Sequence, residues 1–476
     1  MKRIFLIIIT FLAVCAINAQ NDMDAFRFSQ TNWEGTARFM GAGGAFGAVG
    51  AEYSALAINP ATIGLYKRNE ITFTPFVLNV HKSACTYNKT TTPFLATTYS
   101  ISNFGFVIKT TREESMWKAV QFAVGYNRIN NFNNQFRITG MSEGSSMMSE
   151  FINQANGTPY QFLTRDALKA FNTWLIDTIP GEQNSYYSPF TGADIEQTKY
   201  VNTKGGIDEM NFSVGANYNE QIYIGVTLGI PFLKYREETK YKEKDINNVV
   251  AGFESFTITD LLRVSGTGIN AKLGLIYQPV HFFRAGVAFH SPTYYSKLKD
   301  RFKRTIEVIP SDYDDDDDDE NRFDYKLTTP LRVIGSVAFI IQKRAFLSAD
   351  YEFTHYGLAS MYADDYSFSQ ENQDIQDKYR ATHSIRIGGE LFLTDKFLVR
   401  AGYGFTSNPY KKDINSSPTH IGSIGIGVRA KYMFFDLAYA IKFCKEDYWM
   451  YNPLYINHSN NHYITHKIVA TIGVKF

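Results

Sequence analysis

Strict alternation of apolar side chains with small or polar ones recurs along most of this sequence. The pattern is clear over residues 222–230, 385–393, 398–405 and 467–476, where every second position is apolar. Because side chains in a strand have a period of two, each segment predicts a β-strand with one apolar face. Charged residues such as Glu390 and Arg400 fall on the opposite face, which would suit the lumen of a membrane barrel.

The two ends of the chain indicate the cellular compartment in which such strands would fold. Met1–Ala19 joins the basic Lys2 and Arg3 to a short apolar run, which predicts a cleaved secretory signal peptide over residues 1–19. An uncleaved anchor and a lipid attached at Cys15 are the alternatives. After this leader no apolar run is long enough for a membrane helix, and the terminal Phe476 closes an alternating strand. Export combined with such a strand predicts an outer-membrane β-barrel, with a soluble edge strand as the alternative.

The predicted fold class is all-β: a transmembrane antiparallel β-barrel of about 14 strands over residues 70–476. We count roughly fifteen strand segments, and bacterial barrels usually have an even number of strands. The chain has 31 Tyr and 38 Phe, which suit aromatic girdles at the two membrane interfaces. Its net charge of +1 gives no reason to expect a nucleic-acid partner. The expected location is the cell outer membrane.

Two long insertions interrupt the strands, at 141–206 and 309–322, and both are expected to be extracellular loops. The second contains the acidic run 312–320, which must be solvated. An ordinary solvated loop is the simplest interpretation of this run, and cation bridging near lipopolysaccharide is the alternative.

The first insertion contains a predicted amphipathic helix that begins at Thr164 and is stopped by Pro180 and Gly181. Apolar side chains recur on one side of it, which leaves two interpretations: a lid packed on its neighbours, or an extracellular hydrophobic groove for an apolar substrate. The candidate groove residues are Leu168, Phe171, Trp174 and Leu175.

The stretch "MGAGGAFGAVG" precedes the first predicted strand and is too rich in glycine for a stable helix. We expect residues 20–69 to form a compact plug, or hatch, inside the lumen, where small residues let its backbone approach the wall. A nucleotide-binding fingerprint fails because Phe46 stands where its last glycine would be. The glycines of the proposed hatch motif are Gly41, Gly43, Gly44, Gly47 and Gly50.

With Asn59, Pro60 and Ala61, the stretch "RFMGAGGAFGAVGAEYSALAINPATIGLY" resembles the amino-terminal region of the FadL/TodX outer-membrane transport proteins, especially Bacteroidetes-type members. The stretches "TTPLRVIGSVAFIIQKRAFLSADYEFTHYG" and "HSIRIGGELFLTDKFLVRAGYGFTSNPY" resemble later strands of that family. The resemblance implies a 14-stranded barrel blocked by a hatch. It also implies passive uptake of long-chain fatty acids or aromatic hydrocarbons, through an apolar pocket and a lateral exit into the bilayer.

Such a lateral exit would need an inward kink in one strand. The stretch "NNFNNQF" is a candidate, because asparagines are unfavourable inside a strand; a strand end is the alternative. The candidate kink residues are Asn130, Asn131, Asn133 and Asn134.

We expect no enzyme activity, no catalytic residue, no cofactor and no metal site. His290 and Ser291 are adjacent, but nothing marks them as an activated pair of an outer-membrane lipase. His458, His462 and His466 recur every fourth residue, which on a strand is too wide a spacing for one ion. A structural or adhesive barrel without transport remains the main alternative function.

The expected partners follow from this location and from the resemblance. They are a hydrophobic small-molecule substrate, outer-membrane lipid and lipopolysaccharide, and the barrel assembly machinery, which would engage the carboxy-terminal Phe476.

Overall fold

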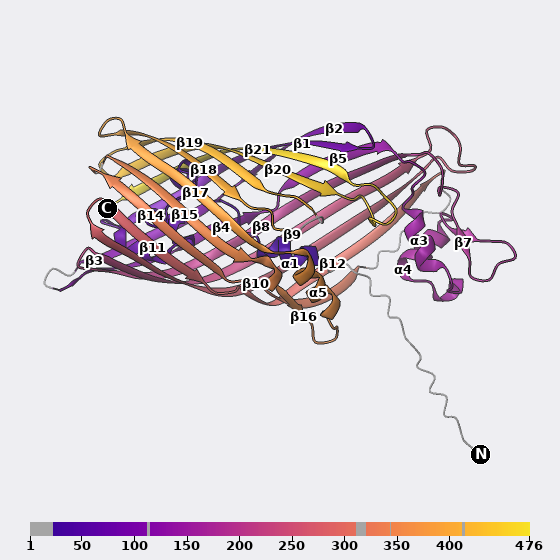
Figure 1. The fold of residues 1–476 in the computed structure, drawn as a ribbon, viewed down its shortest axis with the longest axis horizontal. Helices are drawn as coiled ribbons and strands as arrows, with labels where there is room; N and C mark the ends of the chain where they lie inside the picture. Colours follow the sequence, from indigo (N-terminus) through magenta and orange to yellow (C-terminus); the bar gives the residue numbers. More distant parts are fainter. Residues whose placement is uncertain (1–21, 112–114, 311–319, 343, 412–414) are drawn as a thin grey trace, which may run out of the picture.

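A computed structural model describes residues 22–111, 115–310, 320–342, 344–411 and 415–476 (Figure 1). The predicted leader 1–19 and all of the acidic run 312–320 except Glu320 lie outside the described residues.

Nineteen strand segments belong to one antiparallel sheet, and a two-stranded sheet, β6 (Asp177–Thr178) with β7 (Tyr186–Tyr187), lies in the first long loop. The segments of the large sheet are β1 (Glu70–Tyr87), β2 (Thr90–Ser100), β3 (Asn103–Thr111), β4 (Trp117–Asn131), β5 (Asn134–Met141), β8 (Glu196–Tyr218), β9 (Ile222–Lys244), β10 (Ser255–Val280), β11 (Phe283–His290), β12 (Tyr294–Ile309), β13 (Asn321–Thr328), β14 (Arg332–Ile341), β15 (Ala345–His355), β16 (Ser360–Tyr362), β17 (Ala381–Phe392), β18 (Phe397–Thr406), β19 (Thr419–Arg429), β20 (Met433–Tyr448) and β21 (Ser459–Lys475).

The described helices are short and lie before the barrel or in its loops. They are α1 (Asp22–Ser29), α2 (Ala37–Gly41), η1 (Tyr53–Ala57), η2 (Pro60–Leu65), α3 (Met148–Ala155), η3 (Tyr160–Phe162), α4 (Arg165–Asn172), η4 (Tyr356–Leu358) and α5 (Ser369–Lys378). None of these described helices has the length and apolar character needed to cross a bilayer.

Several segments are two halves of one interrupted strand. For example, β1 pairs with β3 through Glu70–Thr74 and with β2 through Val77–Tyr87, so β3 and β2 follow one another along the same strand of the wall. Counted in this way, the sheet is a closed barrel of 14 strands, sealed by the pairing of β1 with β21. The predicted fold class is confirmed.

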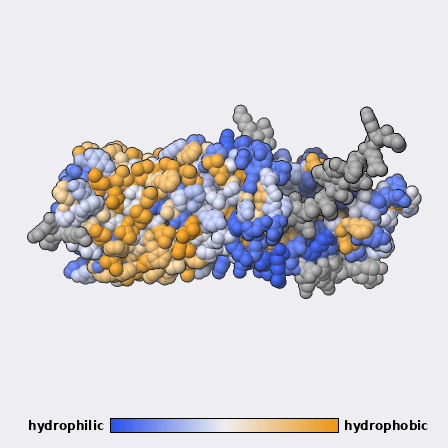
Figure 2. Space-filling view, turned by 90° about the horizontal axis from the view of Figure 1, so that it is seen from below, coloured by the Kyte–Doolittle hydropathy of each residue, from blue (hydrophilic) through white to orange (hydrophobic). Residues whose placement is uncertain are grey.

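On the face seen in Figure 2, an apolar band covers one half of the barrel and the other half is largely hydrophilic. The carboxy terminus lies at the end of the barrel beside the band, and the long loops lie at the opposite end (Figure 1). Outer-membrane barrels keep short turns on the periplasmic side and long loops outside, so the hydrophilic half extends beyond the membrane toward the extracellular side.

Some predicted boundaries were wrong. Residues 196–206 were assigned to the first loop, but they form the start of β8 and pair with β5 and β9. The stretch 321–322, assigned to the second loop, begins β13. Beyond the membrane neither face of a strand needs to be apolar, so these segments lack the alternation on which the prediction relied.

The helix of the first loop begins as predicted, because the Thr164 side chain accepts a hydrogen bond from the backbone N–H of Ala167. It ends at Asn172 and not near Pro180, because Trp174 has a left-handed backbone conformation with φ of 59°.

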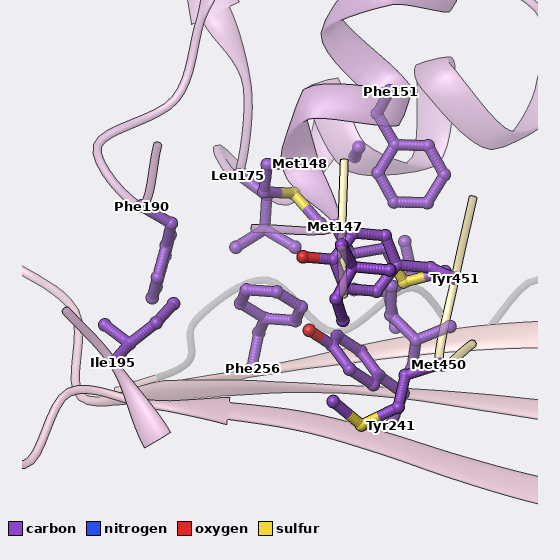
Figure 3. Close-up of a cluster of buried hydrophobic side chains, with 14 of the residues drawn as sticks. Met147, Met148, Phe151, Leu175, Phe190, Ile195, Tyr241, Phe256, Met450 and Tyr451 are labelled. Carbon is purple, nitrogen blue, oxygen red and sulfur yellow. The ribbon is translucent and has the colours of Figure 1, made fainter. Parts of the chain in front are cut away.

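The extracellular mouth is filled by an apolar cluster, which we call the lid core (Figure 3). The loop contributes Met148, Phe151 and Leu175, and the strand ends contribute Tyr241 and Phe256, among others. A buried carboxylate fastens the loop: Glu243 accepts hydrogen bonds from Ser146 Oγ at 2.7 Å and from the Met147 backbone N–H at 2.9 Å. The loop therefore packs as a lid on the barrel.

Candidate functional site

The segment before β1 crosses the lumen and contacts opposite walls. Helix α2 packs on β18 to β21, whereas η2 packs on β4 and β8 to β10. Residues 39–50 are all buried, and Phe46 has 0% exposure. We call residues 22–69 the plug.

Three glycines form one of the places where the backbones of plug and wall meet. Gly43 has φ of 64°, and a Cβ there would lie 2.9 Å from the carbonyl oxygen of Ile387. On the wall, a Cβ on Gly388 would lie 1.9 Å from the oxygen of Ala42, and one on Gly402 would lie 2.1 Å from the nitrogen of Gly43. Any side chain at these wall positions would push the plug away.

The other glycines of the hatch motif are also in close contacts inside the lumen. Gly41 faces Gly425 of the wall, and Gly44 lies against Phe39 within the plug. Gly47 lies against Ser336, and its backbone N–H donates to Asp350 Oδ2 at 3.1 Å. Gly50 lies against Leu65.

The Asn-Pro-Ala triplet organises the plug. Asn59 is fully buried and caps η2, accepting a hydrogen bond from the Ala61 N–H at 3.0 Å. Its amide group donates to the Gly47 carbonyl oxygen at 2.8 Å. Pro60 occupies the first turn of η2, where its missing N–H costs no hydrogen bond. The triplet therefore ties the second half of the plug to the glycine-rich first half.

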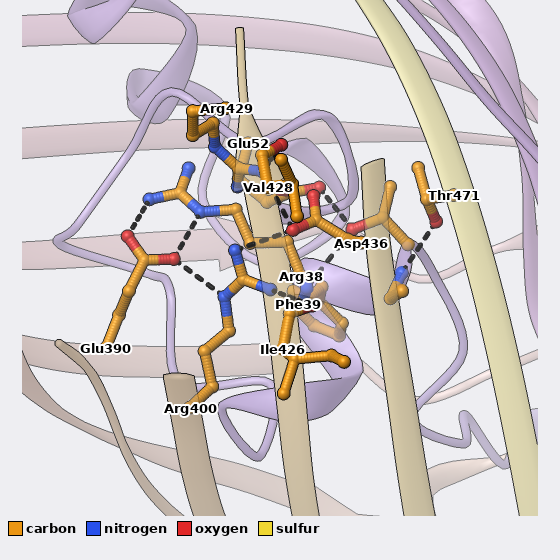
Figure 4. Close-up of polar contacts among 12 residues, drawn as sticks. Arg38, Phe39, Glu52, Glu390, Arg400, Ile426, Val428, Arg429, Asp436 and Thr471 are labelled. Atoms are coloured by element: carbon orange, nitrogen blue, oxygen red, sulfur yellow. Dashed lines mark hydrogen bonds and ion pairs between the residues drawn. The ribbon is translucent and has the colours of Figure 1, made fainter. Parts of the chain in front are cut away.

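An ionic network around Glu390 is one of the contacts that fasten the plug to the wall (Figure 4). The Arg38 guanidinium makes two hydrogen bonds to the Glu390 carboxylate, both 2.9 Å long. Glu390 also accepts from Arg400 at 2.7 Å, and Arg400 lies 2.8 Å from Asp436. Arg429 reaches the same Asp436 at 2.9 Å. The wall contributes two acids and two bases to this network, and the plug contributes Arg38.

The four candidate kink asparagines lie at an interruption of the wall. β4 ends at Asn131 and β5 begins at Asn134, while the neighbouring β8 runs past both. Asn131 Oδ1 accepts from the Asn133 N–H at 3.0 Å, and Asn133 Oδ1 accepts from the Gly205 N–H at 3.0 Å. Side-chain amides thus replace ladder partners at the break.

From the interruption toward the extracellular end, two neighbouring segments of the described wall are in contact without backbone pairing, and we call this line of contact the seam. β2 pairs with β1, and β5 pairs with β8. β2 and β5 lie side by side, yet in the described part of the chain no backbone ladder joins them. This seam runs outward from the level of Val77 and Ser100, which are paired at its lower end.

The plug is bonded directly to the lower end of this seam. The Asn32 amide donates to Asn130 Oδ1 at 2.6 Å, and the Asn130 amide donates to the Gln30 carbonyl oxygen at 2.9 Å. The Asn32 backbone N–H also donates to the Ile129 oxygen at 2.9 Å. The stretch 30–32 therefore lies behind the interruption.

A cavity of about 360 Å³ opens between the plug, the interruption and the inner face of β1, β20 and β21. Phe26, Phe132 and Tyr463 supply aromatic lining, while Lys442 and Asn134 supply polar lining. All four kink asparagines border this cavity. It is large enough for a small organic molecule.

Helix α1 closes one side of the cavity. Phe26 stacks on Tyr379 with ring centroids 4.6 Å apart, and Asp22 accepts from Lys378 of α5 at 2.8 Å. Asp24 is fully buried and bonded to Arg27 at 2.6 Å. Burial raises the pKa of Asp24 to about 7, although Arg27 acts in the opposite direction.

The candidate groove residues do not form one open face. Leu175 is completely buried in the lid core, and Phe171 packs between Tyr160 and Tyr186. Leu168 and Trp174 are 36% and 52% exposed.

A closed antiparallel barrel with an internal plug and long loops on one side is the architecture of outer-membrane channels with a blocked lumen. Among solved structures, the chain is similar to a Pseudomonas aeruginosa FadL homologue, with a TM-score of 0.55, 13% identity, and coverage of 94% of this chain and 99% of that one. It is also similar to the Pseudomonas putida toluene transporter TodX, with a TM-score of 0.53, 12% identity, and coverage of 94% and 99%.

The CymD monoaromatic hydrocarbon channel gives a TM-score of 0.51 at 12% identity, covering 93% of this chain and 98% of that one. No family model matches the chain, and no curated protein matches it in sequence. The chain therefore has the fold of the FadL/TodX channels, as the sequence resemblance implied, and this is the fold of an outer-membrane protein.

The sequence predicted inward-facing Arg400 and Glu390, and both are buried in the lumen. It did not reveal that Arg38 is their plug partner, nor that Asn32 bonds to Asn130. These contacts join residues far apart in the chain, and strand periodicity carries no information about them.

Proposed function

We propose that this protein is a passive outer-membrane channel for hydrophobic small molecules such as long-chain fatty acids or aromatic hydrocarbons. In this proposal the substrate reaches the cavity from the extracellular side and leaves sideways into the bilayer through the interruption at the lower end of the seam. The observation that carries the proposal is that the cavity is bordered by all four asparagines of the interrupted strand.

A lateral route suits an apolar cargo physically. Each CH₂ group removed from water gains about 0.8 kcal/mol, so a fatty acid moves favourably from water into an apolar cavity and then into lipid. Such movement needs no energy source. Binding in the cavity must stay moderate, because the cargo also has to leave.

The cavity lining includes a base that can receive the acidic head of an amphiphile. Lys442 borders the cavity, and no ion pair joins it to another part of the described chain. A carboxylate beside this ammonium group, with its chain against Phe26 and Phe132, would satisfy both kinds of lining.

Filling the cavity tests the proposal. Ala440 is 4% exposed and borders the cavity, whereas Ala401 is exposed on the outer face of β18. In a strain that lacks fatty-acid uptake, the chain should restore uptake, A440W should reduce it at least fivefold, and A401W should leave it unchanged. Normal uptake by a correctly assembled A440W barrel would show that the cavity is not on the route. Parallel uptake of toluene distinguishes an acidic cargo from a neutral one.

The ends of the chain belong to the same proposal. We infer that residues 1–19 direct export, that the barrel wall contacts outer-membrane lipid and lipopolysaccharide, and that Phe476 engages the assembly machinery. Phe476 is 53% exposed at the periplasmic rim, where its backbone exchanges hydrogen bonds with Asn69.

A further inference from the structure

Three tyrosine–histidine pairs of the same geometry lie on the outer face of the barrel. In each pair the phenol oxygen is bonded to the histidine Nδ1, across two neighbouring strands, and the tyrosines are 36–50% exposed. The pairs are Tyr351–His383 at 2.6 Å, Tyr403–His420 at 2.8 Å and Tyr439–His466 at 2.7 Å. They use three of the nine histidines in the chain.

The register of these pairs is also the same. Tyr439 lies opposite Ile468, and its histidine partner, His466, lies two residues earlier on that strand. The same diagonal offset joins Tyr351 to His383 and Tyr403 to His420. Because the tyrosine occupies Nδ1, Nε2 is the ring nitrogen left to face the surroundings.

His466 lies just below the outer edge of the apolar band, because the outward-facing pair Phe443 and Ile464 continues the band above it. His466 is about ten residues from Phe476 at the periplasmic rim, and a tilted strand of about ten residues spans the hydrocarbon region. Between them, Ile468, Ile472 and Val474 face outward and are 37–41% exposed. His466 therefore lies close to the level at which acyl chains end and headgroups begin.

Directly above His466, three more basic groups gather on the outer face of β1, β20 and β21. Lys445 of β20 lies opposite His462 of β21, and Lys82 of β1 lies opposite Ile464. The side chains of Lys82, Lys445 and His462 are exposed. They point outward, because the adjacent residues along each strand line the cavity inside the barrel. We call Lys82, Lys445, His462 and His466 the basic patch.

Within the described residues no ion pair occupies either lysine of the basic patch. The neighbouring outward acid, Asp447, is 3.8 Å from His458 and so is directed toward a different base. The patch therefore has positive charge without a protein counter-charge, at the depth where the headgroups of anionic lipids lie.

We propose that the basic patch binds the phosphorylated headgroup of an outer-leaflet lipid. The phosphate oxygens would accept hydrogen bonds from Lys82, Lys445 and the two histidines. The acyl chains would lie along the apolar face below, which is continuous with the patch through Ile464 and Ile468. The hydrogen bond to Tyr439 would fix the orientation of the His466 ring for this contact.

Lipid retention by the purified full-length protein tests this proposal. The protein is loaded in detergent with bisphosphorylated lipid A or with its dephosphorylated form, and bound lipid is measured by native mass spectrometry. The quadruple variant K82Q/K445Q/H462Q/H466Q should retain at least fivefold less phosphorylated lipid than the wild type, with no change for the dephosphorylated form.

The matched control removes basic groups at the periplasmic end, in the triple variant H281Q/K396Q/K431Q, which should behave as the wild type. Unchanged retention by the quadruple variant would overturn the proposal, as would equal losses of both lipids or an equal loss in the control. If the quadruple variant fails to assemble, the double variant K82Q/K445Q gives the same comparison, with an expected loss of at least threefold. Substrate uptake should not change in any of these variants.

Discussion

Single glycine residues decide how closely the plug and the wall approach each other. The sequence shows that the stretch around Gly43 is too rich in glycine for a stable helix, and this suggests a compact plug. It does not show that Gly388 and Gly402, on two different strands, are the surfaces against which Gly43 lies. In those strands the two glycines look like ordinary small members of an alternating pattern. Only the closed barrel brings the three together.

A substitution at this contact should displace the plug. In G388V the new side chain would start 1.9 Å from the Ala42 oxygen, and overpacking of this kind typically costs about 1–3 kcal/mol. We expect a lower thermal unfolding midpoint in detergent and faster proteolysis within residues 22–69. G335V is the control, because a Cβ on Gly335 meets nothing within 4 Å. Equal behaviour of the two variants would contradict the close contact.

At the scale of whole elements, prediction from the sequence works where one face of a strand meets lipid. β17 and β18 were predicted closely, since their apolar faces repeat at every second residue. The start of β8 was missed, because it stands above the membrane without an apolar face. In the first loop, the apolar spacing of Leu168 and Leu175 suggested one continuous helix. The turn at Trp174 instead sends Leu175 into the lid core.

Helix α1 is the element whose docking should depend on pH. Docking holds the Asp24 carboxyl in a site where its pKa is about 7, against the usual value of 3.8. The docked helix therefore binds a proton that the undocked helix has lost. Docking is strongest below about pH 4 and weakens as the pH rises to about 7. Arg27 opposes this shift, while Asp22, Glu237 and Asp300 reinforce it.

Hydrogen exchange in α1 measures this dependence. After correction for intrinsic rates, opening of α1 in the wild type should increase more than about tenfold between pH 5 and pH 8, since one unit of pKa corresponds to a tenfold change. D24N carries no titrating group and should lose most of this dependence. A pH-independent wild type, or a D24N variant with the full dependence, would show that Asp24 does not control docking.

In the whole molecule, the charge balance of the ionic network in the wall does not depend on the plug. Glu390, Arg400, Asp436 and Arg429 all belong to the wall, and their charges balance without the plug. Arg38 adds two hydrogen bonds from the plug to Glu390. Removing Arg38 therefore leaves no isolated charge in the wall. Removing Glu390, in contrast, would deprive both Arg38 and Arg400 of the carboxylate that they share.

R38Q should therefore release the plug while the barrel stays intact. In planar bilayers, we expect the wild type to conduct ions poorly because the plug fills the lumen, and we expect R38Q to show open events of clearly higher conductance. R68Q is the control, since Arg68 is an exposed plug residue whose only described side-chain contact is with the Lys431 carbonyl oxygen at 3.4 Å. Both variants should keep the heat-modifiable migration of a folded barrel. If R38Q stays closed, the remaining contacts, including the glycine contacts and the ion pair between Glu34 and Lys467, are sufficient to hold the plug without Arg38.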